Sequence, residues 1–154
     1  METTVLTADQ VQALCETREG HFSDRKSARI SPGKLTKTMS AFANADGGEL
    51  LVGIEDDGTW AGVKDEEEFN GHLQVMEDLF PYGSECRYEF FEHAGDGSVV
   101  LKVIIQKARQ VKLATDGKAY VRRGAQSLPA GDVETLRRRK GLTTHETATL
   151  RYDS

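Results

Sequence analysis

Carboxylates and a lysine occur at two places in this chain, and they are the side chains that metal-dependent phosphoryl transfer uses. Asp24 is followed two residues later by Lys26. Glu55 and Asp56 come directly after the apolar run 50–54. Hard carboxylates can hold one or two Mg²⁺ or Mn²⁺ ions, which activate a water and offset charge on a phosphate. Lys26 could then stabilise charge in the transition state. If these groups converge, the pattern indicates chemistry on nucleic acid.

Each of these groups also has an ordinary structural interpretation. Asp24 could form a surface ion pair with Arg25 or Arg29, and such pairs contribute little stability. The four histidines are scattered, which is typical of structural or solvated imidazoles, and only His21 lies near Asp24 in the sequence. The two cysteines lack CxxC spacing, so we expect core or surface thiols rather than a disulfide or zinc site.

Local patterns predict the elements that position the acids. Asp24 and Lys26 project from one face if the segment 22–30 is extended. Ser31 before Pro32 begins a helix predicted to run until the glycine pair 47–48. An apolar strand at 49–55 then precedes the Asp57-Gly58 turn, which predicts a hairpin into a second strand at 59–63.

The rest of the chain completes an α/β (α+β) domain with a mixed, largely antiparallel sheet and flanking helices. Hydrophobic spacing and capping residues predict helices at 8–17, 65–80 and 132–139. Alternating segments bounded by turns predict strands at 87–91, 99–106, 111–114 and 119–122. We expect one domain over residues 1–141, with 142–154 as a C-terminal tail or linker.

Charge is distributed unevenly along the chain. The net charge is −5, yet residues 102–140 contain eleven Lys and Arg against three acids. A basic face would suit nucleic-acid phosphates, although two solvated faces of opposite sign explain the pattern equally well. The basic run 137–140 is expected to stabilise a helix end rather than contact nucleic acid. The candidate phosphate contacts are Arg25, Arg29, Lys34, Lys37, Lys107, Arg109, Lys112, Arg122 and Arg123.

Composition excludes several classes of protein. Hydrophobic residues make up 38% of the 154 and charged residues 29%, which is ordinary for a globular protein. No apolar run approaches the roughly 18 residues that span a bilayer. The amino terminus lacks the pattern of a secretory signal, so a cytoplasmic location is expected.

Three segments together resemble the Schlafen-type AlbA_2 domain, a family often described in bacterial proteins as a DNA-binding or ATP-binding domain. They are AFANADGG at 41–48, LLVGIEDDG at 50–58 and AYVRRG at 119–124. The resemblance covers about residues 10–140. ATP binding has no support in the residues, because no GxxxxGK[ST] motif occurs and the glycine pair 47–48 follows a helix instead of preceding one.

The resemblance implies a carboxylate triad for RNA cleavage, as in the nuclease-competent members. The matching residues are Glu19, Asp24 followed by Lys26, and Glu55 or Asp56. Mg²⁺ or Mn²⁺ would be the cofactor, held by Glu19, Asp24 and Glu55 or Asp56. Two residues depart from the family pattern, since Asp24 stands where glutamate is usual and Glu55 where aspartate is usual.

Two functions from different classes follow from these observations. One is a nucleic-acid-binding domain with a metal-dependent endoribonuclease site for tRNA or other structured RNA. The other is a non-catalytic regulatory module that binds nucleic acid or protein. Convergence of the carboxylates on a common ion separates them. RNA and DNA are both left open as partners, and a homodimer or larger assembly would fit the family.

Overall fold

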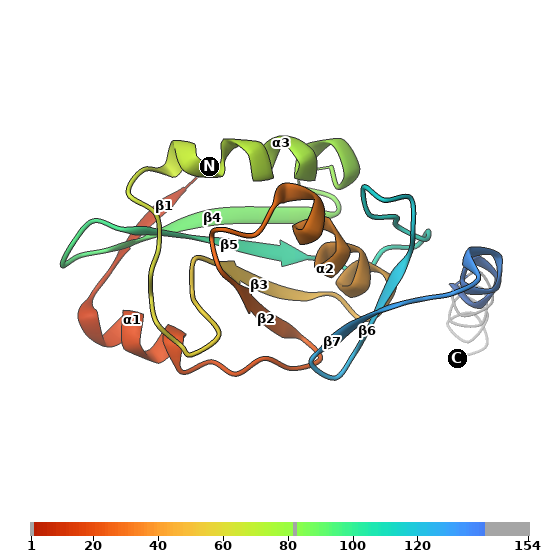
Figure 1. Ribbon diagram of the computed structural model, residues 1–154, viewed down its shortest axis with the longest axis horizontal. Helices are drawn as coiled ribbons and strands as arrows, with labels where there is room; N and C mark the ends of the chain where they lie inside the picture. Colours follow the sequence, from red (N-terminus) through yellow and green to blue (C-terminus); the bar gives the residue numbers. More distant parts are fainter. Residues whose placement is uncertain (1, 82, 141–154) are drawn as a thin grey trace, which may run out of the picture.

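A computed structural model describes residues 2–81 and 83–140. Its centre is a five-stranded sheet with strand order β1-β4-β5-β3-β2, and β6 and β7 form a separate hairpin beside it (Figure 1). The strands are β1 (Thr3–Leu6), β2 (Ser23–Lys26), β3 (Gly48–Val52), β4 (Cys86–His93), β5 (Val99–Ile105), β6 (Tyr120–Arg123) and β7 (Gln126–Pro129). The helices are α1 (Ala8–Cys15), α2 (Pro32–Asn44), the 3₁₀ turn η1 (Glu66–Phe69) and α3 (Asn70–Leu79), and residues 133–140 are also helical.

The sheet is mixed, as the sequence predicts. β1 pairs with β4 and β2 with β3 in parallel, whereas β5 is antiparallel to both of its neighbours. β6 and β7 add a third antiparallel pairing. Both parallel pairs place a short strand at a sheet edge, so β2 presents its residues at the border of the sheet.

Helices α2 and α3 cover one face of the sheet and form the main core. Leu35, Met39 and Phe42 of α2 are fully buried against apolar residues of β3, among them Leu50 and Val52. The opposite face is covered by α1 and the loop after β3, where a smaller cluster forms around Leu51, Ile54 and Val100. Successive strand residues point to opposite faces, so the continuous apolar run of β3 serves both clusters.

Both ends of α2 follow the chemistry that the sequence predicts. Ser31 Oγ accepts the backbone N–H of Lys34 at 3.3 Å, and Pro32 occupies the first turn. At the other end, Gly47 has a φ of 78° and donates its N–H to Phe42 O at 2.8 Å. A Cβ at position 47 would lie 2.8 Å from Ile105 O, so this end of α2 needs glycine for conformation and for space.

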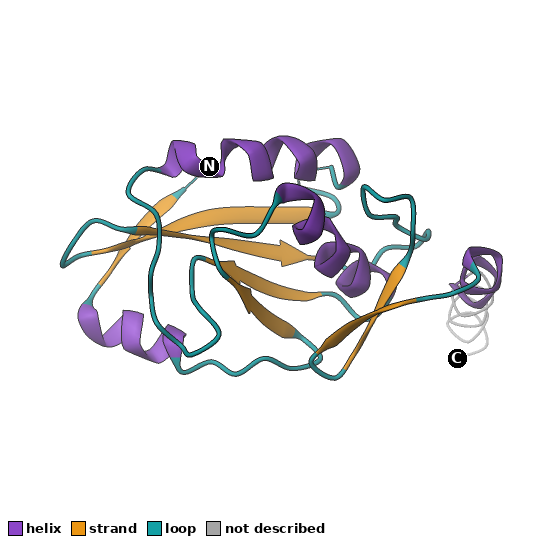
Figure 2. Ribbon diagram, in the orientation of Figure 1, coloured by secondary structure: helices purple, strands orange, loops and turns teal. Residues whose placement is uncertain are grey.

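Two predicted strands are loops instead (Figure 2). Residues 59–63 form only isolated bridges, because Ala61 and Gly62 both donate their N–H groups to Gly53 O. Residues 111–114 form one bridge, through Leu113. β1 and β7 are strands that the sequence analysis did not predict. The helix at 132–139 is confirmed at 133–140, and the predicted tail 142–154 lies outside the described residues.

Candidate nucleic-acid interface

Strand β2 carries Asp24 and Lys26 to the same face, as the alternation predicts. Asp24 is buried, with only 4% of the residue exposed, although its charge demands partners. Its Oδ1 accepts the backbone N–H of Arg25 at 2.7 Å. Its Oδ2 lies 3.5 Å from the ammonium of Lys26. The carboxylate is therefore the centre of a local network rather than a solvated surface group.

Arg122 of β6 is the main partner of Asp24. Its Nη1 donates to Asp24 Oδ2 at 2.9 Å and to Ser127 Oγ at 3.0 Å. The remaining donors reach Gly20 O and Ser23 O at 2.9–3.1 Å. A guanidinium has five N–H donors, so all of them are used. The group also lies 4.7 Å from the centre of the Phe42 ring. Arg122 therefore neutralises Asp24 and ties β6 to the segment before β2.

A second buried network attaches the loop before β6 to helix α2. Asn44 donates to Lys112 O at 2.8 Å and to Tyr120 O at 2.9 Å, and its Oδ1 accepts the N–H of Lys112. Ser40 Oγ, one turn earlier, donates to Lys112 O and accepts the N–H of Tyr120. The asparagine of the AFAN segment thus positions the wall that Tyr120 contributes to the site.

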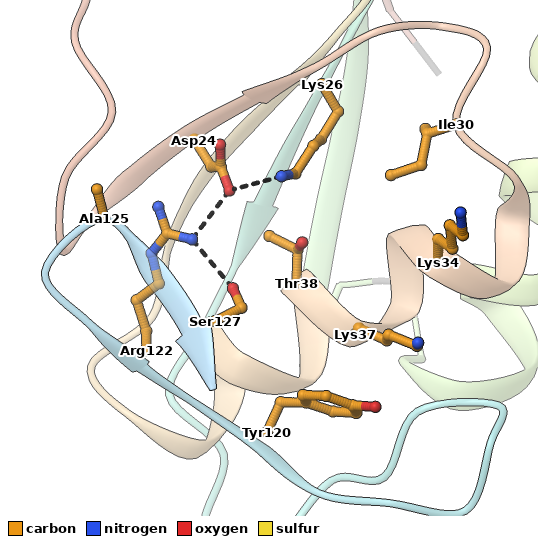
Figure 3. A pocket seen from close by; sticks show the side chains of 10 residues that line it. All are labelled: Asp24, Lys26, Ile30, Lys34, Lys37, Thr38, Tyr120, Arg122, Ala125 and Ser127. Carbon is orange, nitrogen blue, oxygen red and sulfur yellow. Dashed lines mark hydrogen bonds and ion pairs between the residues drawn. The ribbon is translucent and has the colours of Figure 1, made fainter. Parts of the chain in front are cut away.

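Between β2, α2 and the β6–β7 hairpin lies a pocket of about 310 Å³ (Figure 3). Four cationic side chains line it, and Asp24 is the only carboxylate among the lining residues. These cations are Lys26, Lys34, Lys37 and Arg122. The charge of the lining is strongly positive, although the whole chain carries −5.

Lys34 and Lys37 keep their ammonium groups available. Neither forms an ion pair or side-chain hydrogen bond within residues 2–81 and 83–140. Lys37 lies over the Tyr120 ring, 5.8 Å from its centre. The Tyr120 hydroxyl donates to Asp116 at 2.5 Å, and this hydrogen bond raises the pKa of the phenol. The ring therefore forms a fixed wall beside Lys37, whose charge also lowers the pKa of Asp116.

The predicted acids around this pocket differ in their partners. Burial, followed by the charge of Asp24 and a hydrogen bond to it, raises the pKa of Glu19, and the charge of Asp56 adds to the effect. Glu55 instead accepts the Ser27 hydroxyl at 3.0 Å and lies 4.0 Å from Arg29. The fold thus brings Glu19 beside Asp24 and directs Glu55 to other partners.

Mg²⁺ and Mn²⁺ require several oxygen ligands with available lone pairs. Both Asp24 oxygens already have partners, and Oδ2 faces two cations. Within residues 2–81 and 83–140, no three His, Cys, Asp or Glu side chains are grouped to hold a metal ion. As arranged, these donors do not fit a divalent ion at Asp24, and the metal assignment stays a prediction.

The other predicted phosphate contacts lie apart from the pocket lining. The Arg25 guanidinium donates to the backbone oxygens of Cys15, Thr17 and Asp56, which joins the end of α1 to the loop after β3. Lys107 lies 3.9 Å from Asp46, and the ring of His21 contacts the same carboxylate at 2.6 Å.

Lys112 forms an ion pair with Glu85, while Arg109 and Arg123 are exposed. Of the nine predicted basic contacts, only Lys34, Lys37 and Arg122 line the pocket. Thr38, Tyr120 and Ser127 also line it, and the sequence analysis did not identify them as site residues. Thr38 follows Lys34 by four residues on α2, so helical spacing could have indicated it.

The fold and site define a class of protein: a mixed α/β domain with a cationic pocket beside a neutralised, buried acid. The chain belongs to the Schlafen AlbA_2 family, whose model matches residues 19–131, well over half of its length. Domains of this family are generally nucleic-acid-binding. No curated protein matches the chain.

A solved structure with a similar fold is that of the DIP2311 protein from Corynebacterium diphtheriae, with a TM-score of 0.57 and 20% sequence identity. The match covers 71% of this chain and 25% of that protein, so the chain spans about a quarter of its length. At this identity the similarity shows the fold alone. No helix in the described part of the chain is long and apolar enough to cross a membrane.

Proposed function

We propose that this domain binds the phosphates of RNA or DNA through the pocket between β2, α2 and the β6–β7 hairpin. The observation that carries the proposal is the presence of three lysine ammonium groups around a recess whose single carboxylate is neutralised by Arg122. Lys26, Lys34 and Lys37 supply these charges. Phosphate contacts of this kind dominate affinity for nucleic acid and do not depend on its sequence.

The contributions of the four cations differ. All donors of Arg122 are used by protein groups, so this residue shapes the floor of the pocket and does not contact the ligand. Lys26 shares Asp24 with Arg122, at 3.5 Å against 2.9 Å. Lys34 and Lys37 form no ion pair within the described chain, and Lys37 interacts only electrostatically with the exposed carboxylate of Asp116. Phosphate binding therefore depends most on the two lysines of α2.

The salt dependence of binding tests this proposal. Three lysine contacts with a single strand predict a slope of log K against log salt concentration of about −2, from about −0.7 per contact. Fluorescence anisotropy with single-stranded RNA, single-stranded DNA and duplexes measures the slope and identifies the preferred partner. Lys37→Ala should weaken binding to each nucleic acid and reduce the magnitude of the slope by about 0.7.

Lys64→Ala is the matched control, because Lys64 is an exposed lysine that does not line the pocket. It should leave both affinity and slope nearly unchanged. If Lys34→Ala, Lys37→Ala and Lys64→Ala all reduce binding equally, the pocket is not the binding site. Absence of binding at low salt in the wild-type protein would contradict the proposed function itself.

A metal-dependent endoribonuclease acting on tRNA or other structured RNA is the second candidate. In its favour, Glu19 and Asp24 interact directly and Asp56 adds charge nearby. This function requires Asp24 to exchange Arg122 for a metal ion. Incubating labelled tRNA and DNA with Mn²⁺, Mg²⁺ or EDTA tests it. Metal-dependent cleavage that disappears in Asp24→Ala and in Glu55→Ala/Asp56→Ala would support the nuclease, whereas binding without cleavage supports a non-catalytic module.

A further inference from the structure

We propose that the pocket binds a terminal phosphate of a nucleic acid, a phosphomonoester at a 5′ or 3′ end, in preference to an internal phosphodiester. This inference rests on the proposed function and specifies its ligand. Three features of the pocket support it: the excess of positive charge, the concave shape and the available hydrogen-bond donors.

The charge of the pocket suits a dianion better than a monoanion. Four cations against Asp24 leave an excess of three among the lining residues. Two acids outside the lining weaken this excess: Glu19, which interacts with Asp24 and Lys26, and the exposed Asp116, which interacts with Lys37. An internal phosphodiester carries one negative charge, whereas a phosphomonoester carries about −1.5 to −2 at neutral pH. A terminal phosphate is therefore attracted more strongly than an internal one by this positive lining.

The shape of the pocket favours a chain end. Its volume of about 310 Å³ is at the lower end of the roughly 300–1,000 Å³ of small-molecule sites. An internal phosphate has a nucleotide on each side, and both must stay outside a recess of this size. A terminal phosphate is attached on one side only and can enter. Ile30 and the Tyr120 ring provide walls against which the adjoining sugar or base can pack.

Hydroxyl groups add donors for the extra phosphate oxygen. Ser127 Oγ accepts a hydrogen bond from Arg122 at 3.0 Å, which leaves its own hydrogen to donate. Thr38 lines the pocket from α2 and contributes a second hydroxyl (Figure 3). With Lys34 and Lys37 on the same helix, the pocket presents donors from both of its sides. A monoester has three oxygens not bonded to carbon, so it can accept more of these bonds than an internal diester.

Competition binding measures the preference directly. One short internally labelled strand serves as the probe, and unlabelled strands of identical sequence compete in four forms: with a 5′-phosphate, with a 3′-phosphate, with hydroxyls at both ends, and circular. We expect a phosphorylated end to improve competition roughly fivefold, which is the effect of one added charge about 4 Å from an ammonium in water. The better of the two phosphorylated strands identifies the end that is bound.

A pH series and three variants complete the experiment. The preference should shrink between pH about 7.5 and about 5.5, because the monoester gains a proton near pH 6 while the lysines stay charged. Lys34→Ala/Lys37→Ala should abolish it and Lys64→Ala should preserve it, and all three lysines lie at or near the surface, so the variants are expected to fold. Glu19→Gln should strengthen the preference.

The possible failures are distinguishable. If hydroxyl-ended and circular strands compete as well as phosphorylated ones, the terminal-phosphate inference is overturned while backbone binding stands. If the probe itself is not bound at low salt, the proposed function and this inference both fail. A preference that survives Lys34→Ala/Lys37→Ala would place the end-binding site elsewhere and also overturn the inference.

Discussion

Replacing Asp24 by asparagine should destabilise the protein substantially, because it leaves the Arg122 charge buried without a counter-ion. The side chains of Asp24 and Arg122 are only 2% and 1% exposed, so solvent screens neither. Breaking a buried pair by removing one charge costs about 3–5 kcal/mol. Asparagine keeps an oxygen that can accept a bond from Arg122, so we expect the lower end, about 3 kcal/mol.

Urea unfolding followed by circular dichroism measures this effect. With an m-value of about 1–3 kcal/mol per molar urea, the loss lowers the midpoint by roughly 1–3 M. Asp78→Asn removes an exposed carboxylate from the last turn of α3 and should change stability by no more than about 0.5 kcal/mol. Arg122→Met is also expected to destabilise, and the double variant Asp24→Asn/Arg122→Met should lose less than the sum of the two single losses.

The opposite result would refute this reasoning. If Asp24 were kept for ligand binding and were mainly repelled by Glu19, removing its charge would make the protein more stable. If Asp24→Asn is as stable as the wild type or more stable, Asp24 is not the counter-ion on which Arg122 depends. The metal-binding alternative would then regain its main requirement, a carboxylate free to change partners.

Three further predictions follow from the networks around the pocket. Asn44→Ala should lower the free energy of unfolding by about 3 kcal/mol in urea titrations, since several buried partners lose their bonds; a loss below about 1 kcal/mol would contradict the role of this network. Gly47→Ala should cost about 2 kcal/mol in the same assay, from the positive φ and the approach to Ile105 O, and an unchanged midpoint would show that the backbone adapts. The pKa of Glu19 is raised by burial and by Asp24, so the protein loses stability as the pH rises above about 4.5 and Glu19 ionises. Glu19→Gln should therefore raise the melting temperature relative to the wild type more at pH about 7 than at pH about 4. The reverse trend would exclude this cause.

The local elements were predictable because their causes are local. Ser31 and Pro32 begin α2, and the glycine pair ends it, through contacts within a few residues. Alternation placed Asp24 and Lys26 on one face of β2 for the same reason. The mixed character of the sheet followed from the type of segments, whereas its strand order, which includes the unpredicted β1, was not predicted. These parts of the fold needed no knowledge of distant partners.

The missed features depend on contacts between distant parts of the chain. Asp24 and Arg122 are 98 residues apart, and no spacing rule pairs them. Residues 111–114 have a suitable composition for a strand, but Asn44 binds both the N–H and the C=O of Lys112, which removes them from any ladder. Nearby Arg25 and Arg29 were the expected partners of Asp24, whereas a distant arginine satisfies it.

The pocket is built from β2, α2 and the β6–β7 hairpin, which are far apart in the sequence, and this has a consequence for the synthesis of the chain. Asp24 leaves the ribosome about a hundred residues before Arg122, and the hairpin that closes the pocket is made last among the strands. Until then Asp24 has only Lys26 as a counter-ion, and Lys34 and Lys37 face no opposite wall. Competence to bind therefore arises only when the β6–β7 hairpin docks. A ligand that bridges α2 and the hairpin then strengthens this junction, by about 2.7 kcal/mol at a hundred times its Kd.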